Sequence, residues 1–112
     1  MDIATEPAAG GSLCRLAGRL DTATSEAALT ALRAAVSAAG GRVALDLAQV
    51  AYVSSAGLRV LLTAARQAKQ EGGTAVLFGL QPAVLEVFEI SGFGQIIPIL
   101  ADEAAARAAL AG

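Results

Sequence analysis

The sequence predicts an α/β fold in which a strand pair is followed by alternating helices and strands, in the order β-β-α-β-α-β-α-β-α. Short apolar runs bounded by turn formers are typical of buried strands, and several occur along the chain. Between them lie longer stretches whose apolar residues recur at helical spacing. Glycine pairs close two of these helical stretches, at Gly40-Gly41 and Gly72-Gly73. We therefore expect a mixed sheet of four to five strands with four helices.

The N-terminal part predicts an antiparallel hairpin. Strands are expected at residues 3–6 and 12–17, and the intervening Pro7-Ala8-Ala9-Gly10-Gly11 is rich in turn formers. Gly18-Arg19-Leu20-Asp21 then closes the second strand. Asp21 is expected to act as a turn or cap residue, because short carboxylates bond readily to nearby backbone N–H groups.

The first helix is expected at residues 25–39. Thr22 and Thr24 are its candidate N-caps, and Glu26 in the first turn suits the helix dipole. The apolar residues predicted to face inward are Leu29, Leu32 and Val36, with Ala28 and Ala35 beside them.

The middle of the chain contains a nearly continuous apolar run at residues 43–47, typical of a strand covered on both faces. Asp46 interrupts this run and needs a hydrogen-bond partner or a place at the sheet edge. Residues 48–53 are expected to connect this strand to the second helix. The remaining expected elements are a second helix at 56–71, a strand at 74–79, a third helix from Pro82, an edge strand at 96–99 and a last helix capped by Asp102.

Two adjacent serines, Ser54 and Ser55, stand where the second helix begins. From there the apolar residues Leu58, Leu61, Leu62 and Ala65 form one helix face, and Arg59, Thr63, Arg66 and Gln70 lie on the opposite face. Unpaired N–H groups and the helix dipole favour negative charge at such a position. From the residues alone, a serine N-cap worth about 1 kcal/mol and a solvated polar face are the simplest interpretation.

Composition limits the function further. A chain of 112 residues predicts one domain, spanning 1–112, and its net charge of -2 without a basic cluster argues against a nucleic-acid partner. The single cysteine, Cys14, excludes an internal disulfide and fits a reducing compartment. No apolar run resembles a signal peptide or a membrane span, so we expect a cytoplasmic monomer that does not insert into membranes.

The residues that most enzymes use for chemistry are missing. The chain has no histidine, one cysteine and one lysine, Lys69, and it contains neither a zinc-ligand spacing nor a phosphate-binding glycine loop. The sequence therefore predicts a binding or interaction module, not an enzyme, with no metal and no cofactor.

In their order, these motifs resemble those of the STAS domain of the bacterial anti-sigma-factor antagonist family. Gly18-Arg19-Leu20-Asp21 is similar to the family's G-x-L-D motif. The strand at 43–47, followed by Tyr52-Val53-Ser54-Ser55-Ala56-Gly57-Leu58, is similar to its strand and D-S-[ST]-G-L segment. Later landmarks that match in order are Gly72-Gly73, Pro82-Ala83-Val84, Phe88, Ser91-Gly92-Phe93 and Ile96-Ile97.

The resemblance implies a phosphorylation switch. Aligned on Gly57-Leu58, the family's phosphoacceptor is Ser55, with Ser54 as a lesser candidate; Ser54 stands where the family has aspartate and Ala56 where it has a second Ser or Thr. The implied partners are an anti-sigma factor that is also a GHKL-type serine kinase, and a PP2C-type phosphatase. The implied partner-binding residues are Asp21, Ser54, Ser55, Ala56, Gly57, Arg59, Thr63 and Arg66.

Three alternatives remain beside the switch. The first is a STAS protein that does not switch, such as a signalling scaffold or the soluble subunit of a lipid transporter. The second is a nucleotide-binding module, against which the absent phosphate loop argues. The third is a structural α/β domain in which the serines only cap a helix.

Overall fold

The computed structural model describes residues 1–112 and has the predicted element order, with a sheet of five strands and four α-helices. The strands follow one another across the sheet in the order β1-β2-β3-β4-β5. β1 pairs antiparallel with β2, and every other pair is parallel, so the predicted mixed sheet is confirmed. The elements are β1 (Asp2–Ala8), β2 (Gly11–Leu20), α1 (Ser25–Ala38), β3 (Arg42–Val53), α2 (Ser55–Gln70), β4 (Thr74–Phe78), α3 (Pro82–Ser91), a 3-10 turn (Phe93–Gln95), β5 (Ile99–Leu100) and α4 (Glu103–Ala111).

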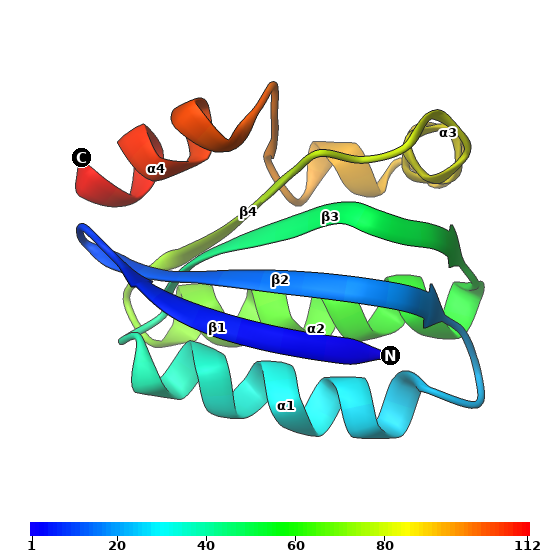
Figure 1. Cartoon of the computed structure of the whole chain (residues 1–112), viewed down its shortest axis with the longest axis horizontal. Coiled ribbons are helices and arrows are strands. Elements are labelled where there is room, and N and C mark those ends of the chain that lie inside the picture. The colour runs from blue at the N-terminus through cyan, green and yellow to red at the C-terminus, as the bar shows by residue number, and fades with distance from the viewer.

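The sheet forms a middle layer between two layers of helices. Figure 1 shows α1 and α2 side by side on one face, and α3 and α4 on the other. β3 lies at the centre of the sheet and is buried on both faces from Val43 to Leu47, as its apolar run predicts. Because its two neighbours are parallel to it, the carboxyl ends of β2, β3 and β4 point in the same direction.

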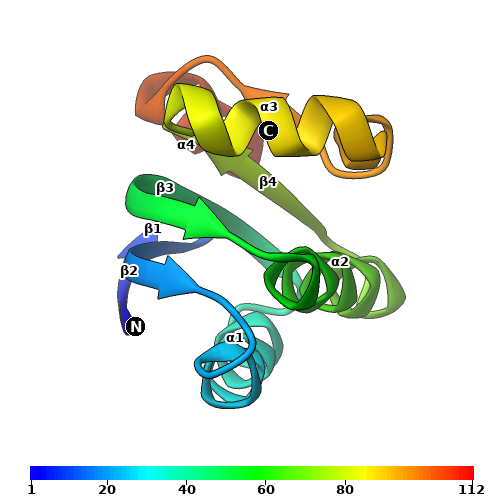
Figure 2. The same ribbon diagram turned by 90° about the vertical axis from the view of Figure 1, so that its right-hand side faces the viewer.

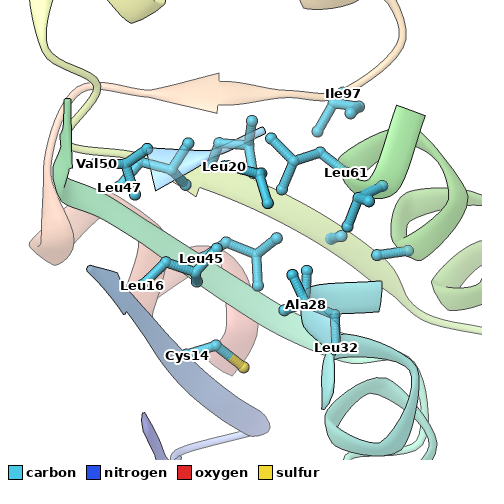
Figure 3. Close-up of a cluster of buried hydrophobic side chains, with 14 of the residues drawn as sticks. Cys14, Leu16, Leu20, Ala28, Leu32, Leu45, Leu47, Val50, Leu61 and Ile97 are labelled. Atoms are coloured by element: carbon cyan, nitrogen blue, oxygen red, sulfur yellow. The ribbon is translucent and has the colours of Figure 1, made fainter. Parts of the chain in front are cut away.

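The larger apolar core lies mainly between the sheet and the α1–α2 layer (Figure 3). Leu32 of α1, Leu61 of α2 and Leu45 of β3 are among its fully buried side chains. Cys14 also belongs to it, and burial raises the pKa of its thiol to about 11. This thiol therefore stays neutral at physiological pH and fills space as a small core side chain. A smaller cluster beneath α4 contains Leu13, Ala44, Val76, Phe78, Ala106 and Leu110.

Several expected strand boundaries are wrong. β1 and β2 extend beyond the expected 3–6 and 12–17, so that only Ala9 and Gly10 are left for the hairpin turn. β3 continues to Val53, so residues 48–53 are strand and not a connection; they pair with the end of β2 across two register shifts that disturb the alternation. The strand expected at 96–99 is shorter and begins at Ile99. Ile97 is buried as part of a turn after the 3-10 helix, so its apolar character reflects core packing and not strand pairing.

The helix faces are close to those predicted, with one systematic difference. In α2 the buried residues include Val60, Ala64 and Ala68, while Leu62 and Ala65 are only half-buried. α2 packs against α1 as well as the sheet, so its buried face is rotated and wider than a single apolar stripe indicates. In α1, Leu32 and Val36 are buried as expected, whereas Leu29 is only half-buried and the neighbouring Ala28 is buried. Phe88 of α3 is buried as expected.

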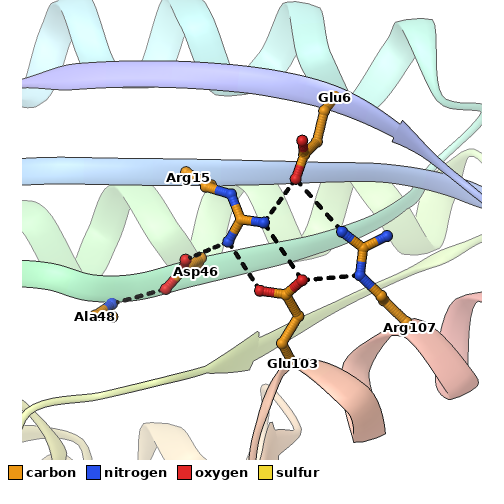
Figure 4. Close-up of polar contacts among 6 residues, drawn as sticks. All are labelled: Glu6, Arg15, Asp46, Ala48, Glu103 and Arg107. Atoms are coloured by element: carbon orange, nitrogen blue, oxygen red, sulfur yellow. Dashed lines mark hydrogen bonds and ion pairs between the residues drawn. The ribbon is translucent and has the colours of Figure 1, made fainter.

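Asp46 has two hydrogen-bond partners in the interior of the sheet. Its Oδ2 accepts from Arg15 at 2.8 Å, and its Oδ1 accepts from the backbone N–H of Ala48 at 2.9 Å (Figure 4). Burial of this carboxylate is therefore compensated by a paired charge and a backbone donor. The first of the two alternatives expected for Asp46 is confirmed.

Arg15 also joins the sheet to α4. Its guanidinium contacts Glu6 of β1 at 2.7 Å and Glu103 of α4 at 2.9 Å, and Glu103 in turn accepts from Arg107 at 2.9 Å (Figure 4). α4 begins as expected at Asp102, whose side chain accepts from the backbone N–H of Ala105. The last helix is thus held to the sheet by paired charges as well as by its apolar side.

No helix in this chain combines the length and the apolar character that crossing a bilayer would require.

Candidate functional site

The two motifs that the sequence places about thirty residues apart meet at one end of the sheet. Figure 2 looks onto this end, where β2 and β3 finish and α1 and α2 begin. Leu20, the last residue of β2, lies opposite Val53, the last residue of β3, and its carbonyl oxygen accepts from the backbone N–H of Ser54 at 2.9 Å. The Gly18–Asp21 segment and the two serines therefore form one surface.

Ser54 caps α2. It has an extended backbone with φ -86° and ψ 177°, and its Oγ accepts from the backbone N–H of Gly57 at 3.2 Å. Its carbonyl oxygen accepts the first helical hydrogen bond, from Leu58 at 2.8 Å. Side chain and backbone of Ser54 are thus both committed to starting the helix.

Ser55 is the first residue of α2, and its side chain is exposed. Its hydroxyl makes no hydrogen bond with the rest of the chain. The backbone N–H groups of Ser55 and Ala56 have no partner inside the helix, since only later residues can reach a carbonyl one turn back. A negative group on Ser55 would lie beside these N–H groups and the positive end of the helix dipole.

Gly57 allows α2 to start this close to β2. A Cβ at this position would overlap the carbonyl oxygen of Leu20 and come within 2.8 Å of the Leu20 Cγ. Any larger residue would push the start of the helix, and Ser55 with it, away from the sheet. Gly57 is buried, so its place among the predicted site residues is to set the position of the backbone.

Asp21 organises the loop between β2 and α1, next to the serines. Its Oδ1 accepts from the backbone N–H groups of Ala23 at 3.1 Å and Thr24 at 3.2 Å. Partial burial alone would raise the pKa of Asp21, but hydrogen bonds from Thr24, Arg19 and Ala23 outweigh it and lower the pKa below its ordinary value. The prediction that Asp21 is a turn or cap residue is confirmed.

The expected threonine caps of α1 are wrong. Thr24 occupies the N-cap position, but its side chain makes no capping bond to the helix. Its hydroxyl instead donates to the carbonyl oxygen of Arg19 at 2.8 Å and accepts from the backbone N–H of Asp21 at 3.0 Å. The Asp21 carboxylate accepts from the N–H groups of Ala23 and Thr24 in the loop before α1, and the Thr24 hydroxyl closes the same loop.

Arg19 and Tyr52 belong to the same surface and were not among the predicted site residues. The Arg19 guanidinium carbon lies 4.2 Å from the centre of the Tyr52 ring, and Arg19 Nε donates to Asp21 at 3.4 Å. The Tyr52 side chain is exposed although it is large and aromatic. The register of β2 and β3 places Arg19 and Tyr52 opposite each other. This pairing between strands would identify them as neighbours, and it cannot be read from the sequence of either strand alone.

The remaining predicted residues continue this surface along α2. A shallow groove of about 290 Å³ runs between α1 and α2 and is lined in part by Ala56, Arg59 and Thr63. Thr63 is half-buried, and its hydroxyl donates to the carbonyl oxygen of Arg59. Arg66 is exposed and lies about two turns of α2 beyond Arg59. The predicted residues thus run from the start of α2 along the helix, and no three His, Cys, Asp or Glu side chains gather in a way that could bind a metal ion.

Known proteins are similar to this chain in sequence or in fold over most of its length. A family model described as "Mlab, STAS domain" matches residues 5–100. BtrV of Bordetella bronchiseptica, a candidate anti-sigma factor antagonist, is 47% identical over 94 residues, which cover 84% of this chain and 81% of that protein. The anti-sigma-B factor antagonist of Listeria monocytogenes is 34% identical over 84 residues, 75% of this chain and 74% of its own length.

Solved structures agree on the fold. An anti-sigma factor antagonist from Mycobacterium paratuberculosis superposes with a TM-score of 0.88, at 22% identity, covering 99% of this chain and 94% of the other. The phosphorylated form of the Bacillus cell fate determinant SpoIIAA superposes with a TM-score of 0.68, also at 22% identity, over 93% and 96% of the two chains. From sequence and fold together, the chain belongs to the STAS domain family, among the anti-sigma factor antagonists.

Proposed function

We propose that this protein, acting as one STAS domain over residues 1–112, is the antagonist in a partner-switching pathway. The unphosphorylated form binds an anti-sigma factor through the Ser54–Ser55 corner and the exposed side of α2, and so frees a sigma factor. Phosphorylation of Ser55 releases it. The observation that carries this proposal is the division of roles between the serines: Ser54 is committed to capping α2, whereas the Ser55 hydroxyl is exposed and unpartnered.

The same geometry explains why phosphorylation would leave the domain folded. A phosphate on Ser55 adds a charge of about -1.5 to -2 at the positive end of a helix dipole, where a negative group gains about 0.3–2 kcal/mol. Inside an interface the same charge loses its water and meets any negative neighbour, which costs several kcal/mol. Each 1.4 kcal/mol changes affinity tenfold, so the complex dissociates without unfolding.

Ser54 occupies the place of the family aspartate and is compatible with the switch. Serine and aspartate are about equally good N-caps, so the start of α2 is preserved. The difference is that the residue before Ser55 in the sequence carries no negative charge, and the nearest charged side chain along α2 is Arg59, one turn away. The negative group that remains on this surface is Asp21, whose carboxylate already accepts from the backbone N–H groups of Ala23 and Thr24.

The partners follow from this proposal. The anti-sigma factor is also a GHKL-type serine kinase that modifies Ser55, and a PP2C-type phosphatase removes the phosphate. Sigma factors act on transcription in the bacterial cytoplasm, so we place this monomeric protein there. The SpoIIAA structure in its phosphorylated form shows that a protein of this fold carries a phosphate, which supports the proposal.

The test is the affinity for the anti-sigma factor, measured by calorimetry. Ser55→Ala should bind like the unphosphorylated protein under all conditions, and Ser55→Asp should bind at least about tenfold more weakly, since 1.4 kcal/mol corresponds to that factor. Thr5→Asp adds the same charge on the exposed edge strand β1 and serves as the matched control, with unchanged affinity expected. Equal affinities of Ser55→Ala and Ser55→Asp would contradict the switch.

A STAS protein that does not switch is the second candidate. The matching family model carries the name Mlab and not that of an antagonist, which favours keeping a scaffold or the soluble subunit of a lipid transporter as the alternative. Incubation with ATP and the kinase, followed by mass spectrometry, separates the two. The switch requires one added phosphate on the wild type and on Ser54→Ala, and none on Ser55→Ala. An unmodified wild type supports the alternative.

A further inference from the structure

The cations of this chain fall into two groups according to their partners. Of the eight Arg and Lys residues, three form ion pairs and Arg42 donates to the backbone carbonyls of Gly10 and Leu110. The other four have no ion-pair partner and are all exposed. They are Arg33 of α1 and Arg59, Arg66 and Lys69 of α2.

These four residues lie on one side of the molecule, on the outer surface of α1 and α2, which we call the α1–α2 face. The acidic residues of the same helices and their caps are only Glu26 and Glu71, so the face carries a formal charge of 4 - 2 = +2. The whole chain carries -2, which leaves -4 on the rest of the molecule. The protein is acidic overall, and the net positive α1–α2 face begins next to Ser55.

We propose that the α1–α2 face recognises an acidic surface of the anti-sigma factor, and that the Ser55 phosphate acts by cancelling the charge of this face. The inference rests on the proposed function and adds the chemical character of the partner surface. Charges placed to complement a partner speed association and suppress wrong partners. Four exposed cations with no internal ion pair are available for that role without first breaking a contact within the chain.

Distances along α2 decide which cation the phosphate affects most. With a rise of 1.5 Å per residue, Arg59 lies about 6 Å along the helix from Ser55, and Arg66 lies about 16 Å away. Exposed charges are screened over about 8 Å at physiological salt. A phosphate of about -1.5 to -2 therefore acts mainly on the Arg59 end of the face, where Glu26 lines the same groove, and brings the total charge of the face close to zero.

The experiment measures the association rate constant with the anti-sigma factor that binds the wild type in calorimetry. Electrostatic steering changes such rates by about 10- to 1,000-fold, so the wild-type rate should fall at least about tenfold between 50 and 500 mM salt. The double variant Arg59→Glu/Arg66→Glu should associate at least about tenfold more slowly at the low salt. Both side chains are exposed, and circular dichroism confirms that the variant is folded.

The matched control reverses two charges on the opposite side of the molecule. Glu86→Lys/Glu89→Lys on α3 changes the net charge by the same amount in the other sense, and its association rate should stay within about twofold of the wild type. If the two double variants changed the association rate by similar factors in opposite directions, net charge and not the α1–α2 face would be responsible, and the inference would be overturned.

A second outcome would also overturn it while leaving the proposed function intact. If the wild type binds and is released by phosphorylation of Ser55, but its association rate is independent of salt and of Arg59→Glu/Arg66→Glu, then phosphate acts by another route.

The expected result includes a smaller difference in affinity between the phosphorylated and unphosphorylated proteins at 500 mM salt than at 50 mM. Binding of a 20-base-pair DNA duplex at 150 mM salt would assign the face to nucleic acid and would overturn the inference as well.

Discussion

Arg15 under α4 and Arg59 on α2 are the same residue type in opposite surroundings. Arg15 contacts three carboxylates, those of Glu6, Asp46 and Glu103, and these contacts raise its pKa further above the ordinary arginine value. Arg59 contacts none. On the α4 side, charged groups are matched to one another across four elements; on the α1–α2 side, the cations and the Ser55 hydroxyl are left open.

This difference separates side chains that hold the fold from those available to a partner. A guanidinium already bound to carboxylates must give up those contacts before it can bind anything else, whereas an unpaired one loses only water. The start of α2 shows the same contrast between residues that hold the fold and a residue that is left unpartnered. Ser54 and Gly57 fix the start of α2, and their rigidity keeps the adjacent, unpartnered Ser55 in place.

The strongest test of this contrast is Gly57→Ala. In an ordinary helix alanine would add about 1 kcal/mol of stability. Here its Cβ would overlap the Leu20 carbonyl, and overpacking against backbone costs about 1–3 kcal/mol or more. The propensity gain offsets part of this cost, so we expect a net loss of about 2 kcal/mol in urea unfolding. Gly94→Ala is the control, because its Cβ would only touch Ile99 at 3.5 Å; an equal loss there would contradict the close approach at Gly57.

A smaller loss of stability should distinguish Ser54 from Ser55. Ser54→Ala removes the cap of α2 and should lower the free energy of unfolding by about 1 kcal/mol, while Ser54→Asp should change it by only a few tenths. Ser55→Ala should change it by less than about 0.5 kcal/mol, since no internal hydrogen bond is lost. Urea unfolding of the three variants tests this. A loss in Ser55→Ala as large as in Ser54→Ala would show that the hydroxyls share the cap.

The element order and the position of Ser54 and Ser55 at the start of α2 could be predicted from local patterns. Helical spacing, glycine stops and the serine pair are short-range signals, and the positions of α2 and its first residues followed from them. Membership of the antagonist family also confirms the prediction that the chain is not an enzyme, because these antagonists are regulatory proteins without catalytic activity.

Features that depend on pairing across the sheet could not be predicted. The contact between Arg19 and Tyr52 requires the register of β2 and β3, which two irregularities shift. The link from Glu6 to Arg107 joins opposite ends of the sequence. The apolar run around Ile97 gave a strand signal although it packs as a turn, because apolar spacing reports burial and not backbone hydrogen bonding.

The smallest expected effect is a change in thermal stability that comes from the ion pairs of Glu103 under α4, and it is seen only at acidic pH. Hydrogen bonds from Arg15, and then from Arg107, lower the pKa of Glu103 from 4.5 to about 2. As the pH falls, the unfolded chain takes up this proton first, so the contribution of Glu103 to stability is complete above about pH 4.5 and is lost as the pH approaches about 2. Glu103→Gln removes the charge at every pH, and its thermal midpoint should therefore decline less steeply than that of the wild type across this interval. Glu89→Gln on α3 lacks an ion pair and should follow the wild-type curve; if Glu103→Gln also ran parallel to the wild type, the paired charges under α4 would contribute nothing to the fold.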